Sequence, residues 1–139
     1  MQITSLSGRD YLTLSGGEAQ KVHMCRVLAQ IGEDGEVEGK FLFLDEPVSH
    51  LDLKYQYALL RAARELCSVQ HTVIAVLHDI NLALSFADRI LFMKQGNIAY
   101  DVQNVRAVSE AIIEDVFDIK AHILYPEPER PVVMVDHFR

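Results

Sequence analysis

Two hydrophobic periodicities alternate along this chain. Uninterrupted apolar runs at 41–44 and 73–77 predict short strands over 40–44 and 72–77, and the first has the pattern of a strand buried on both faces of a parallel sheet. Between and before these runs, apolar residues recur every three or four positions, which predicts helices over 15–32 and about 53–67. Strands that alternate with helices indicate an α/β domain with a parallel sheet.

The second half of the chain predicts smaller elements. A short helix is expected over 81–87, and the turn signal at 94–97 predicts a hairpin of strands 89–93 and 97–102. Ser109 is expected to open a further helix, and two strands are expected over 121–125 and 132–135. The side chains expected to point inward from that helix are Ile112, Ile113, Val116 and Phe117.

Composition narrows the class of protein. The 139 residues are 50% apolar, which suits one globular domain with a core, and the apolar runs fall far short of the ~20 residues that span a bilayer. The first nine residues lack the apolar segment of a signal peptide. A net charge of −7 argues against a nucleic-acid partner. Cys25 and Cys67 are expected to be reduced core thiols, as in cytosolic proteins.

The first group of residues that could bind a ligand or take part in a reaction is Ser15, Gly16, Gly17 and Glu18. Ser15 followed by Glu18 three residues later predicts a capping box at the start of a helix. The two glycines leave backbone amides exposed at the positive end of that helix, which is a potential anion site. Taken alone, the block more often means an ordinary capped helix.

The second and third blocks follow the two predicted strands. Asp45 and Glu46 stand at the carboxyl end of the first strand, where α/β sheets bind ligands, and Pro47 ends it. One carboxylate could hold Mg²⁺ through a water molecule, and the next could orient and deprotonate an attacking water. His78 follows the second strand. A lone histidine is usually structural, so its meaning depends on the other blocks.

These blocks, in this order, resemble the second half of an ATP-binding-cassette (ABC) ATPase domain. Residues 49–52 match the position of the family's D-loop, with His50 where alanine is usual. No stretch matches G-x-x-x-x-G-K-[ST], the phosphate-binding P-loop, and Gly39-Lys40 is the nearest approach. The resemblance therefore implies a partial P-loop NTPase fold, with residues 1–139 forming the C-terminal part of one ABC ATPase domain that lacks the N-terminal P-loop half.

The resemblance also implies roles for individual residues. Glu46 and His78 would be catalytic, and Asp45 would hold Mg²⁺ through water. Ser15, Gly16 and Gly17, with Glu18 and Asp52, would contact ATP, the first three reaching the γ-phosphate held by an opposite subunit. Tight binding of ATP and Mg²⁺ would need the absent P-loop half, so the isolated chain is expected to be inactive.

Several stretches are similar to the ATPase subunits of bacterial haem importers. They are residues 7–11, the acidic insert at 32–39, residues 76–83 with 86–89, and the tail at 126–133. Two copies of such a subunit form a homodimer at the cytoplasmic face of the inner membrane, and the homodimer drives a membrane permease. A periplasmic substrate-binding protein would act with it indirectly, and haem would touch the permease rather than this chain.

Three alternatives remain open at this stage. An importer ATPase for an iron chelate or cobalamin would share residues 76–83. A non-catalytic ABC-like interaction module is compatible with the missing P-loop. Chromosome-maintenance and DNA-repair ATPases also carry these blocks, but they need a long coiled coil before the signature, where only 14 residues precede Ser15 here, and the acidic charge disfavours DNA.

Overall fold

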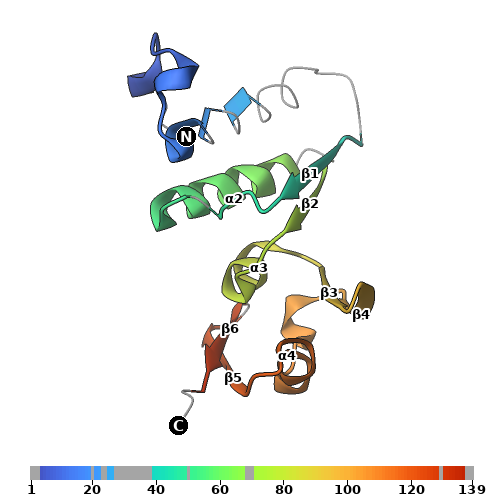
Figure 1. Cartoon of the computed structure of the whole chain (residues 1–139). Helices are drawn as coiled ribbons and strands as arrows, with labels where there is room; N and C mark the ends of the chain where they lie inside the picture. Colours follow the sequence, from blue (N-terminus) through green and yellow to red (C-terminus); the bar gives the residue numbers. More distant parts are fainter. Residues whose placement is uncertain are drawn as a thin grey trace. The chain divides into compact units, whose positions relative to one another are not determined.

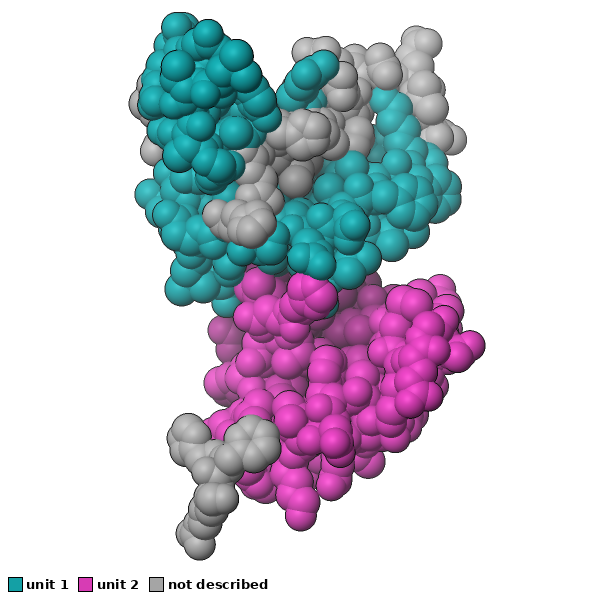
Figure 2. Space-filling model, in the orientation of Figure 1, with its two compact units in different colours: residues 1–77 teal, residues 78–139 magenta. Residues whose placement is uncertain are grey.

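The computed structural model describes residues 4–19, 21–22, 25–26, 39–49, 51–67, 71–128 and 130–136. The chain divides into two compact units, residues 1–77 and 78–139, which Figure 2 distinguishes by colour. The order of elements along the chain can be followed in Figure 1.

The first unit contains a β–α–β arrangement. Strand β1 (Phe41–Asp45) pairs in parallel with β2 (Thr72–Val76), and helix α2 (Leu53–Cys67) lies between them in sequence. Two short 3₁₀ turns, η1 (Thr4–Leu6) and η2 (Tyr11–Thr13), precede a helical stretch that includes residues 16–19, 21–22 and 25–26. The predicted parallel strands and the helix between them are confirmed. The predicted helix end at Gly32 and most of the acidic insert lie outside the described residues.

The two faces of the β1–β2 sheet differ in burial. Leu42 and Leu44 are buried on one face, and α2, which contacts β2, buries Leu59, Leu60 and Ala63. On the other face the exposed apolar side chains are Phe41 (65%), Phe43 (71%), Ile74 (44%) and Val76 (51%). The prediction that these strands are buried on both faces is therefore wrong for the described part of the chain. A continuous apolar run shows that a strand suits burial on both faces, but it does not supply the layer that covers them.

The second unit is built from small elements around one core. They are α3 (Ile80–Phe86), β3 (Ile90–Lys94), β4 (Asn97–Val102), η3 (Val105–Ala107), α4 (Glu110–Phe117), β5 (Ala121–Glu127) and β6 (Arg130–Val135). Strands β3 and β4 form the predicted antiparallel hairpin. Strands β5 and β6, which were predicted as two strands without a pairing, form a second antiparallel hairpin. Gln95 and Gly96 both have positive φ (52° and 78°), which suits the tight turn between β3 and β4.

Hydrophobic residues from every helix and strand of the second unit pack together. The fully buried Leu84 of α3 and Ile113 of α4 join Phe92 of β3 and Val133 of β6 in one cluster. Phe117, expected to point inward, is partly exposed, but its ring meets that of Phe92 edge-on with centroids 6.2 Å apart. The second unit therefore has its own hydrophobic core.

The two cysteines only partly match their predicted environment. Neither takes part in a disulfide bond, and Cys25 is partly buried while Cys67 is exposed. The prediction that Cys67 is a core thiol is wrong. Although it continues the spacing of the buried face of α2, it is the final residue of that helix, beyond the buried Leu59, Leu60 and Ala63.

Asp115 of α4 is expected to make the second unit sensitive to acid. Hydrogen bonds from Lys94 (2.8 Å) and Tyr100 (3.1 Å) lower the pKa of the Asp115 carboxyl, the one from Lys94 contributing most. A carboxyl whose pKa is lower in the folded state stabilises the fold above its unfolded pKa. That stabilisation is lost as pH falls through the folded pKa, below the ordinary value of 3.8.

Asp115→Asn should therefore destabilise the chain at neutral pH and reduce the further loss of stability on acidification. Urea unfolding between pH 7 and pH 2.5 measures both effects. The matched control is Glu114→Gln, which changes an exposed carboxylate one position away on the same helix. An equal acid dependence in Asp115→Asn and the unaltered chain would contradict the role given to Asp115.

Candidate functional site

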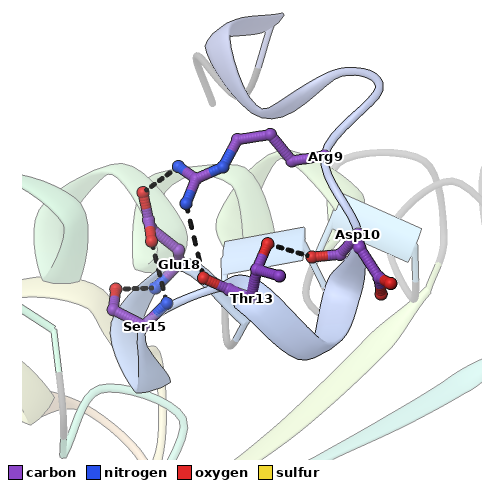
Figure 3. Close-up of polar contacts among 5 residues, drawn as sticks. All are labelled: Arg9, Asp10, Thr13, Ser15 and Glu18. Atoms are coloured by element: carbon purple, nitrogen blue, oxygen red, sulfur yellow. Dashed lines mark hydrogen bonds and ion pairs between the residues drawn. The ribbon is translucent and has the colours of Figure 1, made fainter.

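The Ser15–Glu18 block forms the capping box that its sequence predicts. The backbone amide of Ser15 donates to Glu18 Oε2 (2.8 Å), and the amide of Glu18 donates to Ser15 Oγ (3.3 Å), as Figure 3 shows. Ala19 continues the helix by donating its amide to the Ser15 carbonyl (2.9 Å). The side chains of Ser15 and Glu18 therefore both stabilise the start of the helix.

Arg9 and Asp10 support this helix start. Arg9 forms an ion pair with Glu18 (3.0 Å) and donates a hydrogen bond to the carbonyl of Thr13 (3.4 Å), as Figure 3 shows. The Asp10 carbonyl accepts the Thr13 hydroxyl (2.7 Å, Figure 3), and the Asp10 side chain caps η2 by accepting the amide of Leu12 (3.0 Å). The bonds from Ser15 to the Glu18 carboxylate, assisted by Arg9, lower the pKa of Glu18. Sequence reasoning singled out residues 7–11 only by resemblance. The nine-residue separation of Arg9 and Glu18 has no periodic signal that could have predicted the contact.

Gly16 offers room for a ligand at the first turn of this helix. It is exposed, and a Cβ atom placed on it would meet no heavy atom within 4 Å. The first amides of a helix point outward from its end, so a negatively charged group could approach the backbone here. One further contact orients the helix, because Lys21 Nζ lies 3.2 Å from the centroid of the Tyr55 ring of α2.

Asp45 and Glu46 end β1 with an unusual backbone. Asp45 is the last residue of the strand, and Glu46 has φ of 44°, in the left-handed region that non-glycine residues seldom occupy. Both residues are exposed. The amide (3.3 Å) and the hydroxyl (3.0 Å) of Ser49 both donate hydrogen bonds to the Glu46 carbonyl. The chain thus turns immediately after the strand, and the approach of both carboxylates to one ligand stays a prediction. Such local strain is frequently found at functional sites.

The loop that follows is fixed to α2. The amide group of Gln56 donates to the carbonyls of Val48 (3.2 Å) and Leu51 (3.0 Å), while Val48 and Leu51 are buried. Asp52 precedes α2 and accepts the amides of Tyr55 and Gln56 at its carbonyl. Gln56 is a positioning residue that the motif pattern did not reveal. His50, the departure from the usual D-loop, lies outside the described residues.

His78 lies in the other unit from these residues. It is exposed in the loop between β2 and α3, where the next residue, Asp79, caps α3 by accepting the amides of Asn81 (2.8 Å) and Leu82 (3.1 Å). The structure therefore describes Ser15–Glu18, Asp45, Glu46 and Asp52 within the first unit and His78 at the start of the second. A meeting of His78 with the two carboxylates stays a prediction.

Among the described residues, no group of three or more histidine, cysteine or acidic side chains forms a metal cage. Asp45 and Glu46 nevertheless offer exposed carboxylate oxygens, the hard ligands that Mg²⁺ takes one or two at a time together with water and phosphate oxygens. The residues present are thus compatible with Mg²⁺ held partly by a nucleotide.

The chain is similar in sequence to known proteins. No family model matches it. Hemin import ATP-binding protein HmuV of Hahella chejuensis is 42% identical over 94% of this chain and 52% of its own length. HmuV of Deinococcus radiodurans is 49% identical over 81% of this chain and 44% of its own length. The chain resembles the ATP-binding subunits of ABC transporters.

A solved structure supports the fold of this chain. A metal-chelate type ABC transporter in an inward-facing conformation matches with a TM-score of 0.72 and 24% identity, over 96% of this chain and 52% of that one. The predicted partial ABC ATPase fold and the resemblance to haem importers are both confirmed. The chain spans about half the length of the relatives it matches. No helix within the described residues is long and apolar enough to cross a membrane.

Proposed function

We propose that this ABC chain supplies the signature and water-activating parts of the ATP-hydrolysing subunit of an importer whose cargo is haem. The observation that carries the proposal is the Asp45–Glu46 pair, which leaves β1 through a left-handed turn at the edge where parallel sheets bind ligands. The names of the relatives support haem as the cargo. The metal-chelate transporter favours an iron chelate as a second candidate, at lower identity.

The residues would divide the work between two nucleotides. Asp45 would hold Mg²⁺ through water, and the ion would neutralise phosphate charge. Glu46 would orient the attacking water and accept its proton, with His78 beside the γ-phosphate of the same nucleotide. Ser15, Gly16 and Gly17 would meet the γ-phosphate of the nucleotide held by a second subunit, and Glu18 and Asp52 would support those contacts. A permease in the membrane and a homodimeric arrangement follow from this role, at the cytoplasmic face of the membrane.

The role requires a P-loop from elsewhere. The chain has no P-loop sequence, and it spans about half of its relatives. The exposed face formed by Phe41, Phe43, Ile74 and Val76 supports the same requirement, because parallel sheets occur almost always with both faces covered. A P-loop half that packs on this sheet would complete it and bring phosphate to Asp45 and Glu46.

The isolated 139-residue chain is expected to bind Mg-ATP weakly and to leave it unhydrolysed. Much of the affinity for a triphosphate comes from P-loop amides and their lysine, which this sequence lacks. Isothermal titration with Mg-ATP is the measurement, and a micromolar dissociation constant would contradict the expectation.

The same titration and an ATPase assay are then repeated with an added polypeptide. It comprises the part of the Hahella chejuensis relative that this chain does not match. Appearance of Mg-ATP hydrolysis in the mixture, and in neither component alone, is the result that supports the proposed function. If the two polypeptides form a complex that binds Mg-ATP but does not hydrolyse it, the water-activating role of this chain is wrong.

A further inference from the structure

Helix α3, which follows His78, is joined to strand β6 by an amide side chain. Asn81 Nδ2 donates to the carbonyl of Val133 (3.0 Å), and the amide of Val133 donates to Asn81 Oδ1 (2.8 Å). The two bonds satisfy both backbone groups of one strand residue, as a neighbouring strand would. Asn81 and Val133 are separated by 52 positions in the sequence, so the contact fixes two distant segments to each other.

The other end of α3 is held by the same strand. The guanidinium of Arg130, the first residue of β6, donates to the carbonyls of Leu84 (3.4 Å) and Ser85 near the end of the helix. A cation at this place satisfies end carbonyls and complements the negative end of the helix. Leu84 is fully buried in the core of the second unit, and the Ser85 hydroxyl bonds back to the Asn81 carbonyl (2.7 Å).

Asp79, which caps α3, connects His78 to the contact between Asn81 and Val133. The side chain of Asp79, the residue next to His78, accepts the amide of Asn81 (2.8 Å), so the cap of α3 includes the residue that β6 holds. We propose that Asn81 and Arg130 are positioning residues for His78, and that β6 acts as the template that fixes the His78 loop. This inference rests on the proposed function only for the chemical role of His78.

The same contacts assign a structural role to the tail at 126–133. The sequence showed that this segment resembles the haem-importer subunits, but it indicated no chemical role for it. Arg130 and Val133 are the two tail residues that hold α3. Arg106 of η3 also donates to the carbonyl of Pro128 (3.1 Å) in the turn between β5 and β6, which ties the hairpin to the rest of its unit. The tail thus determines where the loop before α3 lies.

The direct test measures the His78 loop in the full chain by NMR. In Asn81→Ala, two partly buried hydrogen bonds are lost, so amide hydrogen exchange at residues 79–83 should rise about tenfold to a hundredfold, and the His78 ring signals should shift. Amides of β3 and β4 should keep their exchange rates. Asn97→Ala is the matched control, because it removes an asparagine hydrogen bond from the β3–β4 turn of the same unit.

Asn81→Asp is a second variant, which keeps an acceptor for the Val133 amide but places a carboxylate oxygen against the Val133 carbonyl. It should also raise exchange in the same residues. An equal rise throughout 78–136 in both variants, or an unchanged His78 ring in both, would overturn the proposal. The first result would show a purely structural contact, and the second a His78 loop that is independent of β6.

A kinetic test of the same proposal uses the ATPase reconstituted with the P-loop polypeptide. Asn81→Ala and Arg130→Ala should each lower kcat about tenfold with little change in KM, because nucleotide binding resides elsewhere and only the position of His78 changes. Asn97→Ala should leave both constants unchanged. Equal kcat in Asn81→Ala and the unaltered chain overturns the proposal. If His78→Ala itself leaves kcat unchanged, the proposed role of His78 is wrong, although the NMR result still decides whether β6 fixes its loop.

Discussion

Replacement of Glu46 with glutamine is expected to lower ATP turnover by the reconstituted subunit about a hundredfold to ten-thousandfold, the range typical of a lost general base. The amide keeps the size and shape of the side chain but cannot accept the proton of the attacking water. Binding of Mg-ATP should remain, since Asp45 and the P-loop are unaltered. Steady-state kinetics together with titration of Mg-ATP separates the two quantities.

The backbone at Glu46 provides a second measurement on the same residue. Its φ of 44° costs a non-glycine residue about 1 kcal/mol or more, a cost that glycine does not bear. Glu46→Gly should therefore be at least as stable as the unaltered chain in urea unfolding while turnover is lost. Glu114→Gln, which alters an exposed carboxylate of α4, is the matched control and should change neither property. Turnover by Glu46→Gln at the unaltered rate would show that another group is the base.

Substitution of Ser15 with arginine in an assembled dimer is expected to lower ATPase activity about a hundredfold, comparable to the loss of one preorganised donor from a reaction centre. The long side chain would fill the open space at the start of the helix, where Gly16 has no neighbour against its Cβ position. It also removes the oxygen that accepts the Glu18 amide, which costs about 1 kcal/mol of local stability. Initial nucleotide capture should persist because it depends on the P-loop of the other subunit.

Two comparisons make the Ser15 result specific. Ser109→Arg removes the equivalent capping oxygen of α4, which accepts the Ile112 amide (3.4 Å), and should retain activity. In mixed dimers, one Ser15→Arg subunit is paired with one subunit whose P-loop is disabled, which places both defects at a single ATP site and leaves the other complete. Both defects in the same subunit spoil both sites. Equal residual activity in the two arrangements, corrected for assembly and cooperativity, would refute the action of Ser15 across the dimer.

The local elements of this chain were predictable because their causes are local. The capping box of Ser15 and Glu18 needs only a three-residue spacing, and the β3–β4 turn needs only residues that accept positive φ. The apolar run of β1 likewise predicts a strand wherever it is placed. The candidate carboxylates Asp45 and Glu46 could be found for the same reason, since they follow that strand directly.

Contacts between segments distant in sequence could not be predicted in this way. Arg9 with Glu18, and Asn81 with Val133, join residues whose separation carries no periodic signal. The exposure of Phe41 and Phe43 was missed for a related reason. Their apolar character reports what the sheet can bury, whereas burial itself depends on a covering layer that only tertiary structure reveals.

The uncovered sheet face also bears on the lifetime of the chain in a cell. Phe41, Phe43, Ile74 and Val76 present aromatic and β-branched side chains on two strands, the kind of surface that promotes aggregation and recognition by chaperones when it is left in water. Proteases remove proteins that remain in such states, so small changes in burial alter abundance several-fold. The cellular amount of this chain should therefore depend on whether that face is covered.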